Sequence, residues 1–95
     1  TLQPAFILER LRVLADQVFR RFEQSGFKSF RTVVVTVRFG DFQTKTRSRT
    51  VPKPITALAP LNGEVLRLVL PFLDQRENPR RKLIRLIGVR IEKLS

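Results

Sequence analysis

Residues 32–52 read TVVVTVRFGDFQTKTRSRTVP, an apolar strand, a tight turn and a returning strand with almost no apolar residue. Alternate positions of the first half are apolar, which is the period-two pattern of a half-buried β-strand. The residues expected on the buried side are Val33, Val35, Val37 and Phe39. Gly40 and Asp41 supply the turn, which Phe42 can close, and prolines at 52 and 54 cannot continue a ladder. The stretch therefore predicts a hairpin with strands at 31–39 and 43–51.

The returning strand is the strongest candidate for function. Alternation places hydroxyls on one face, at Thr44, Thr46, Ser48 and Thr50, and cations on the other, at Lys45, Arg47 and Arg49. Hydroxyls, backbone amides and arginines all donate hydrogen bonds to phosphate oxygens without reading a base sequence. Charge on an edge strand also protects it from aggregation. The two interpretations are compatible, and the lack of an apolar face favours binding of a polyanion.

Two amphipathic helices and a third strand complete the predicted fold. Apolar residues recur at three- and four-residue steps over 4–25 and 60–75, which indicates helices, and residues 83–92 alternate as a strand. Gly26 suits the left-handed cap after the first helix, and Pro71 should kink or fray the end of the second. The order α-β-β-α-β predicts a single α+β domain over 1–95. Both helices cover one face of an antiparallel sheet, and the other face stays open with Arg38, Gly88 and Arg90.

The composition favours a nucleic-acid partner. The chain has 19 Lys and Arg against 8 Asp and Glu, a net charge of +11, and most of its cations are arginines. Such a basic domain is typical of polyanion binders. Without Cys or His, disulfides, thiolate catalysis and the usual zinc sites are excluded. No 18-residue apolar run predicts a membrane span, no acid pair suits two-metal catalysis, and the start at Thr1 rather than Met indicates a fragment.

Two segments resemble the little finger of Y-family translesion DNA polymerases, of the DinB or DNA polymerase IV type. They are TKTRSRTVP at 44–52, which fits a strand ending T-x-S-R-T-x-P, and IRLIGVRI at 84–91, which fits a last strand reading I/V-R-x-I/L-G-V-R. The resemblance extends over essentially the whole chain. It implies an accessory domain that lays its open sheet in the major groove of primer–template DNA and grips both phosphate backbones.

The resemblance also implies roles for individual residues. Thr44, Thr46 and Arg47 are expected to contact one DNA strand, and Arg85 and Arg90 the other. Together with the residue pattern, this gives the expected phosphate-binding set Arg38, Thr44, Thr46, Arg47, Ser48, Arg49, Arg85 and Arg90. Catalysis is expected from the parent DNA-directed DNA polymerase, whose palm domain holds the magnesium ions, so no cofactor is expected in this fragment. The implied location is the cytoplasm, at the bacterial nucleoid.

The chain departs from the family pattern in three places. The family domain opens with a strand before the first helix, and here that strand is missing. Its loss predicts an exposed apolar edge at 84–91, through which two copies can associate. Leu86 stands where some relatives have a second Arg. The chain ends without the clamp-binding peptide of bacterial relatives, so contact with a sliding clamp is expected through the parent protein.

Two other functions remain open at this point. An RNA-binding module is favoured by aromatic side chains on an open sheet, but Phe39 continues the buried row and Phe42 belongs to the turn. A protein-docking domain, with the sliding clamp as an example of a partner, is favoured by binding that persists at high salt.

Overall fold

The computed structural model describes residues 4–73, 76, 78–80 and 82–95, with side chains from residue 6 onward. Two helices and three strands follow one another as α1 (Pro4–Gln24), β1 (Phe30–Phe39), β2 (Thr44–Ile55), α2 (Leu58–Leu73) and β3 (Ile84–Glu92). The strands form one antiparallel sheet in the order β2-β1-β3. The predicted α+β fold class is confirmed.

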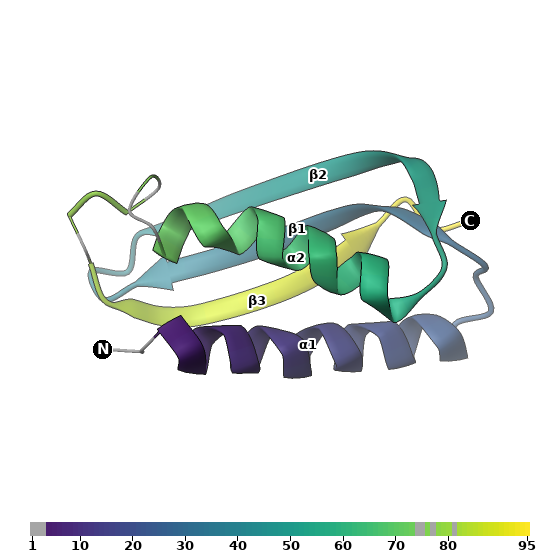
Figure 1. Ribbon diagram of the computed structural model, residues 1–95, viewed down its shortest axis with the longest axis horizontal. Helices are drawn as coiled ribbons and strands as arrows, with labels where there is room; N and C mark the ends of the chain where they lie inside the picture. Colours follow the sequence, from purple (N-terminus) through teal and green to yellow (C-terminus); the bar gives the residue numbers. More distant parts are fainter. Residues whose placement is uncertain (1–3, 74–75, 77, 81) are drawn as a thin grey trace.

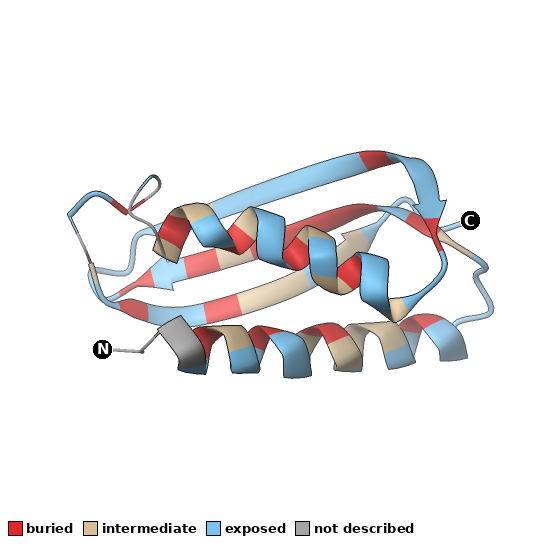
Figure 2. Ribbon diagram, in the orientation of Figure 1, coloured by how far each residue is buried: buried red, intermediate tan, exposed pale blue. Residues whose placement is uncertain are grey.

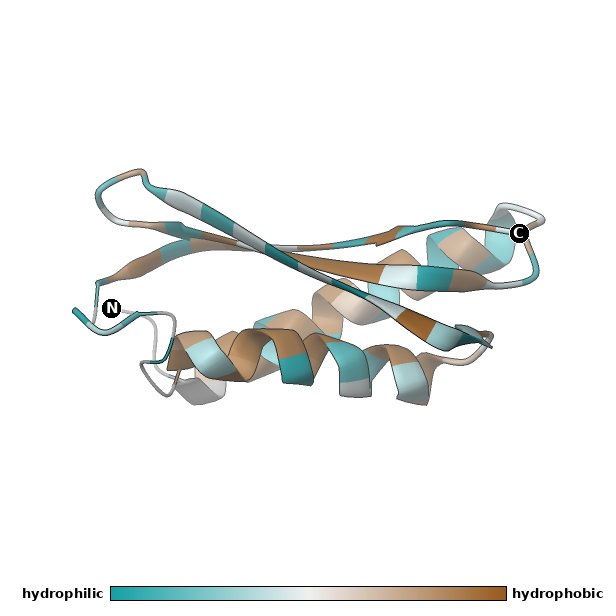
Figure 3. Cartoon of the chain, turned by 90° about the horizontal axis from the view of Figure 1, so that it is seen from above, coloured by the Kyte–Doolittle hydropathy of each residue, from teal (hydrophilic) through white to brown (hydrophobic). Residues whose placement is uncertain are grey.

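The molecule has two layers, with both helices on the same face of the sheet (Figures 1 and 3). α1 packs along β3, and α2 packs over β1 and β2. The core lies between the layers and includes Leu11, Ala15, Val35, Leu61 and Val69, all essentially inaccessible to solvent. No described helix lies on the second face. That face is therefore left open for contacts with another molecule.

α1 ends where the sequence predicted a cap. The Ser25 hydroxyl donates a 2.6 Å hydrogen bond to the Phe22 carbonyl, which satisfies one of the free acceptors of the last turn. Gly26 follows with a φ of 84°, the left-handed conformation that glycine adopts without a Cβ penalty. The predicted left-handed cap is confirmed, and the helix stops one residue before the predicted end at 25.

β1 is the central strand and the most deeply buried one (Figure 2). Val33, Val35 and Val37 face the helices and are inaccessible. Val34 points to the opposite face but is only 3% exposed, because its neighbours Ser48 on β2 and Arg90 on β3 flank it there. The central strand therefore contributes little accessible surface to the open face near Val34. The accessible groups of this face come from the two outer strands and from the hairpin end.

The predicted end of the second strand at residue 51 is wrong, because β2 continues through both prolines to Ile55. β2 is an edge strand, and an edge strand tolerates proline where its missing N–H would face away from the neighbouring strand. The pairing also becomes irregular there: Thr32 pairs with Thr50, whereas Phe30 pairs with Ile55. Residues 51–54 are therefore accommodated in a bulge of the edge strand.

α2 begins at Leu58, two residues before the predicted start at 60. Pro60 falls in its first turn, where backbone N–H groups have no partner within the helix, so the missing donor costs little. At the other end the helix continues past Pro71 to Leu73. The predicted final residues at 74 and 75 lie outside the described residues.

β3 contains one bulge that explains its burial pattern. Arg38 pairs with Leu86, but the next residue, Phe39, pairs with Ile84, so Arg85 is an extra residue in the ladder. Arg85 and Leu86 are consequently both exposed, although they are adjacent, while Ile84 and Ile87 are buried. The bulge presents Arg85 at the hairpin end of the sheet.

Candidate nucleic-acid interface

The open face consists of three parallel rows of side chains set by the strand register. In the central row, Thr36 lies between Thr46 of β2 and Gly88 of β3. The β2 row carries hydroxyls only, at Thr44, Thr46, Ser48 and Thr50. The β3 row contains Leu86, Gly88, Arg90 and Glu92. The structure therefore gathers the four predicted hydroxyl residues on one face, together with Arg38 and Arg90.

Hydrogen bonds organise both ends of this face. The Thr32 and Thr50 hydroxyl oxygens lie 2.8 Å apart across β1 and β2. At the hairpin end, Arg38 Nε donates to Thr44 Oγ1 over 3.2 Å. This bond ties the Arg38 side chain of β1 to the hydroxyl row of β2. Such a mixed row of hydroxyl and guanidinium donors suits oxygen-rich anions.

The cations on this face outnumber its carboxylates. Arg90 is 65% exposed and lies 3.3 Å from Glu92, which is the one carboxylate on the three described strands. Exposed ion pairs of this kind are weak, so Glu92 does not prevent Arg90 from binding another anion. Arg38 and Arg85 carry no such carboxylate on the open face among the described residues. The strands therefore place more cations than carboxylates on this face.

Arg47 and Arg49 lie on the other side of the sheet. They pair with Val35 and Val33, which face the helices, so their side chains leave β2 on the helix side. Arg49 Nε is 3.0 Å from the Glu64 carboxylate of α2, whose side chain is only 17% exposed. These two members of the expected phosphate-binding set are thus separated from the hydroxyl row. The Arg49–Glu64 pair was not predicted, since alternation does not reveal which helix covers β2.

The hairpin turn contains Phe42 as well as the predicted Gly40 and Asp41. The Phe42 N–H donates to the Phe39 carbonyl and the Phe39 N–H to the Gln43 carbonyl, both over 2.9 Å, so residues 40–42 form a three-residue loop. The left-handed position is Phe42, with a φ of 67°, and Gly40 is not in that conformation. Gly40 instead donates to the Leu83 carbonyl over 2.8 Å. The Phe42 side chain is exposed in this loop.

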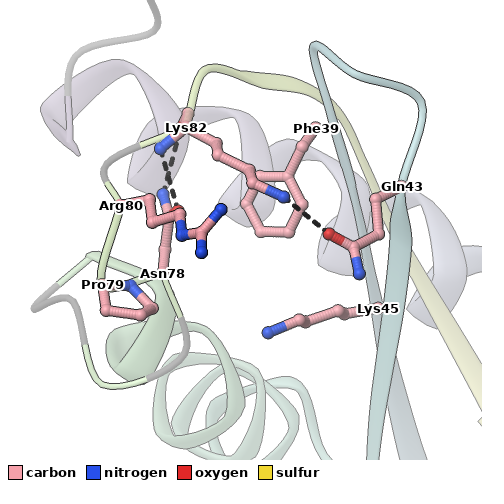
Figure 4. A pocket seen from close by; sticks show the side chains of 7 residues that line it. All are labelled: Phe39, Gln43, Lys45, Asn78, Pro79, Arg80 and Lys82. Carbon is pink, nitrogen blue, oxygen red and sulfur yellow. Dashed lines mark hydrogen bonds between the residues drawn. The ribbon is translucent and has the colours of Figure 1, made fainter.

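A basic pocket of about 290 Å³ lies on the helix side of the same end of the sheet (Figure 4). Its lining residues are Phe39, Gln43, Lys45, Asn78, Pro79, Arg80 and Lys82. Asn78 fixes the loop by exchanging two hydrogen bonds with the backbone of Lys82. Lys82 Nζ in turn donates to Gln43 Oε1 over 2.7 Å and lies 2.8 Å from Asp41 Oδ2. These contacts tie the loop before β3 to the hairpin.

Asp41 is the carboxylate most affected by these contacts. The hydrogen bond from Lys82, followed by the Gln43 N–H at 3.1 Å, holds the pKa of Asp41 below its usual value of 3.8. The charged form is favoured because both donors stabilise the carboxylate. The charged Asp41 carboxylate therefore links the hairpin to Lys82 in the loop before β3.

Metal-ligating side chains do not cluster among the described residues. Within residues 4–73, 76, 78–80 and 82–95, no three His, Cys, Asp or Glu side chains gather closely enough to hold a metal ion. The described helices also include none that is long and apolar enough to cross a membrane.

Comparison with known proteins relates this fold to DNA polymerases. The impB/mucB/samB family C-terminal domain matches residues 1–95. The chain is 36% identical over 95 residues to DNA polymerase IV of Methanoculleus marisnigri, and 37% identical over 92 residues to DNA polymerase IV 2 of Mesorhizobium japonicum. The two matches include 100% and 94% of this chain, but they span only 24% and 21% of the length of the relatives.

A solved structure supports the same relationship at the level of the fold. The chain resembles a structure described as a complex of the beta-clamp processivity factor and the little finger domain of PolIV, with a TM-score of 0.54 and 16% identity. The match covers 93% of this chain and 77% of that one. By sequence and fold together, this chain belongs to the impB/mucB/samB family of C-terminal domains, as its two strand motifs indicated.

Proposed function

We propose that this domain binds duplex DNA without sequence preference, and that its open sheet face holds the phosphate backbone near a primer–template junction. The observation that carries the proposal is the uncovered face itself, on which Arg38 of β1 and Arg90 of β3 share one side of the sheet with the exposed hydroxyl row of β2. Donors of this kind position a protein on DNA but carry no base information. The net charge of +11 favours association with a polyanion.

The parent protein, in this proposal, is an error-prone DNA-directed DNA polymerase that copies past lesions in DNA damage and repair. The relatives named DNA polymerase IV support this assignment. Nucleotide transfer and its magnesium ions belong to the rest of that polymerase, and the domain's task is to hold the DNA. The proposal locates the parent in the cytoplasm, at the nucleoid.

The first experiment is a salt titration of binding to a fluorescent primer–template duplex. If roughly five to seven phosphates are neutralised, log affinity falls against log salt with a slope of about −0.9 per phosphate. Arg38→Ala and Arg90→Ala should each weaken binding to a similar extent on unrelated sequences and reduce the slope by roughly one. The effect should be independent of sequence because the contacts are to phosphate.

Arg20→Ala is the matched control for Arg90→Ala. Arg20 is 74% exposed and lies 3.3 Å from Asp16, the same separation as between Arg90 and Glu92, but it belongs to α1 on the covered side. The control should leave the salt slope nearly unchanged. The proposal is wrong if no duplex binding occurs at low salt, or if Arg20→Ala and Arg90→Ala weaken binding equally.

Arg47 and Arg49 do not lie on the open face, so a separate test is needed for their contact with DNA. Their side chains leave β2 on the helix side, so they reach phosphates only if the DNA backbone follows the outer edge of β2. Arg47→Ala tests this course of the backbone. A loss similar to that of Arg90→Ala supports contact along the edge, whereas an unchanged slope confines the interface to the open face.

Docking of a sliding clamp is a second candidate function. It is favoured by the similar little finger domain that was solved in complex with a beta-clamp processivity factor. Isothermal titration of the domain with purified clamp tests it, and the heat of binding should persist at salt concentrations that abolish DNA binding. An absence of heat at any salt concentration excludes docking by this domain alone. The RNA-binding alternative loses support, because both strand phenylalanines, Phe30 and Phe39, are buried.

A further inference from the structure

Phe42 combines backbone strain with exposure at the end of the open face. Its φ of 67° lies in the left-handed region, which is unfavourable for a residue with a Cβ atom and typical of Gly or Asn at this position of a three-residue loop. Its side chain is nevertheless 64% exposed, so the strain is not compensated by burial in the core. An observed outlier of this kind is a reason to look for a function.

Arg85 holds the Phe42 ring in position. The central carbon of its guanidinium group lies 4.5 Å from the ring centroid, which is a cation–π contact. Arg85 reaches the ring because the bulge of β3 makes it the extra residue of the ladder. One side of the ring is thus covered by a guanidinium group, and the exposed fraction leaves the rest accessible.

The surroundings of the ring differ from the rest of the open face. Leu86, which is 54% exposed, pairs with Arg38, and Arg38 donates to Thr44. At the hairpin end, the hydrogen-bond donors that suit phosphate therefore give way to two exposed apolar side chains, Leu86 and Phe42. Phosphate oxygens offer such side chains no favourable contact, whereas the flat face of a nucleobase does.

We infer that Phe42, backed by Arg85, forms a stacking site for an unpaired nucleobase. The inference rests on the proposed function: with the open face on the duplex backbone, the hairpin end meets the base at which one strand leaves the duplex. Any base can stack, because every base has a π face. Arg85 remains able to contact the phosphate beside that base, since its donors lie along the edges of a guanidinium plane. The domain thereby distinguishes a junction from a continuous duplex.

The test compares Phe42→Gly and Phe42→Trp on two DNAs, a blunt duplex and the same duplex with a single-stranded extension that starts with 2-aminopurine. Glycine suits the left-handed position, so Phe42→Gly should fold at least as stably as the wild type. It should reduce the preference for the extended DNA about fivefold to tenfold and leave affinity for blunt DNA unchanged. Phe42→Trp should retain the preference, and 2-aminopurine fluorescence should be quenched only with an aromatic residue at 42.

Phe27→Gly is the control, since Phe27 is another exposed phenylalanine but precedes β1 at the opposite end of the strand. It should not alter the preference. An equal preference in the wild type and Phe42→Gly, or no change in 2-aminopurine fluorescence, overturns the stacking site while blunt-duplex binding still supports the proposed function. Failure to bind either DNA at low salt overturns the proposed function, and the stacking site with it.

Discussion

Gly88 leaves a gap among the side chains of the open face. A glycine inside a strand often marks the close approach of another backbone, but a Cβ added at Gly88 would meet no atom of the described chain within 4 Å. The glycine is therefore not required by packing inside the domain. Gly88 lies beside Thr36 on the open face, in the edge strand β3, where a ligand can approach it from outside.

Gly88→Val separates folding from binding at this position. Valine favours strands and meets no obstacle, so the free energy of unfolding should stay constant or rise by up to about 1 kcal/mol. Duplex affinity should fall several-fold, because the isopropyl group occupies the space that the DNA backbone needs. Urea denaturation and the fluorescent duplex titration measure the two effects. Unchanged affinity would mean that the DNA does not approach β3 at Gly88.

Asp41 should make the hairpin sensitive to acid. Its pKa is lowered in the folded state by the hydrogen bond from Lys82 and then by the Gln43 N–H. The charged carboxylate therefore contributes stability above its usual pKa of 3.8, and this contribution is lost as the pH falls through the lower folded-state value. Asp41→Asn should be less stable than the wild type at about pH 6, and the difference should shrink by about pH 2.5.

Urea denaturation at the two pH values measures that difference. A gap between the wild type and Asp41→Asn that stays constant with pH would show that the amide disturbs the turn in some other way, and that the charge of Asp41 is unimportant.

At the scale of the elements, an ion pair joins β2 to α2. Its cation, Arg49, was expected to bind DNA. Arg49 reaches Glu64 on the helix side, where the carboxylate is largely shielded from solvent. Removing the guanidinium leaves this shielded carboxylate without its cation, so Arg49→Ala should lower the free energy of unfolding by about 1 kcal/mol or more. In a Glu64→Gln background the same substitution should cost clearly less. Equal costs in both backgrounds, measured by urea denaturation, would contradict a structural role for the pair.

The alternation of residues predicted the faces of β1 and β3 but not the extent of β2. A period of two follows from strand geometry alone, so the buried row of Val33, Val35 and Val37 could be identified from the sequence. Whether Pro52 and Pro54 end a strand depends on its being at an edge, which is a property of sheet order. The side chosen by Arg47 and Arg49 likewise depends on the tertiary fold.

The candidate site was predictable to the same degree. The hydroxyl row and Arg90 were found because the motifs and the alternation agree on their face. The contact between Phe42 and Arg85 was not predicted, because it depends on the bulge of β3, which nothing in the local sequence indicates. The features that escaped prediction are those that require two distant segments to meet.

For the molecule as a whole, the net charge of +11 favours binding of DNA and opposes association with a second copy of the domain. It attracts DNA, so added salt weakens that complex. It also repels a second copy of the domain, so added salt should favour pairing of two exposed β3 edges into a continuous sheet. DNA binding and self-association are thus expected to respond to salt with opposite signs.

Sedimentation velocity over a series of protein and salt concentrations tests the self-association. We expect a monomer at low salt and a dimer that grows with both variables, because screening removes repulsion between like charges while the strand edge continues to offer unpaired N–H and C=O groups. A monomer under all conditions would mean that the β3 edge does not pair with a second copy. The result also fixes the conditions for the duplex titration, since a dimer joined through β3 holds Arg90 beside its interface and alters the surface that DNA meets.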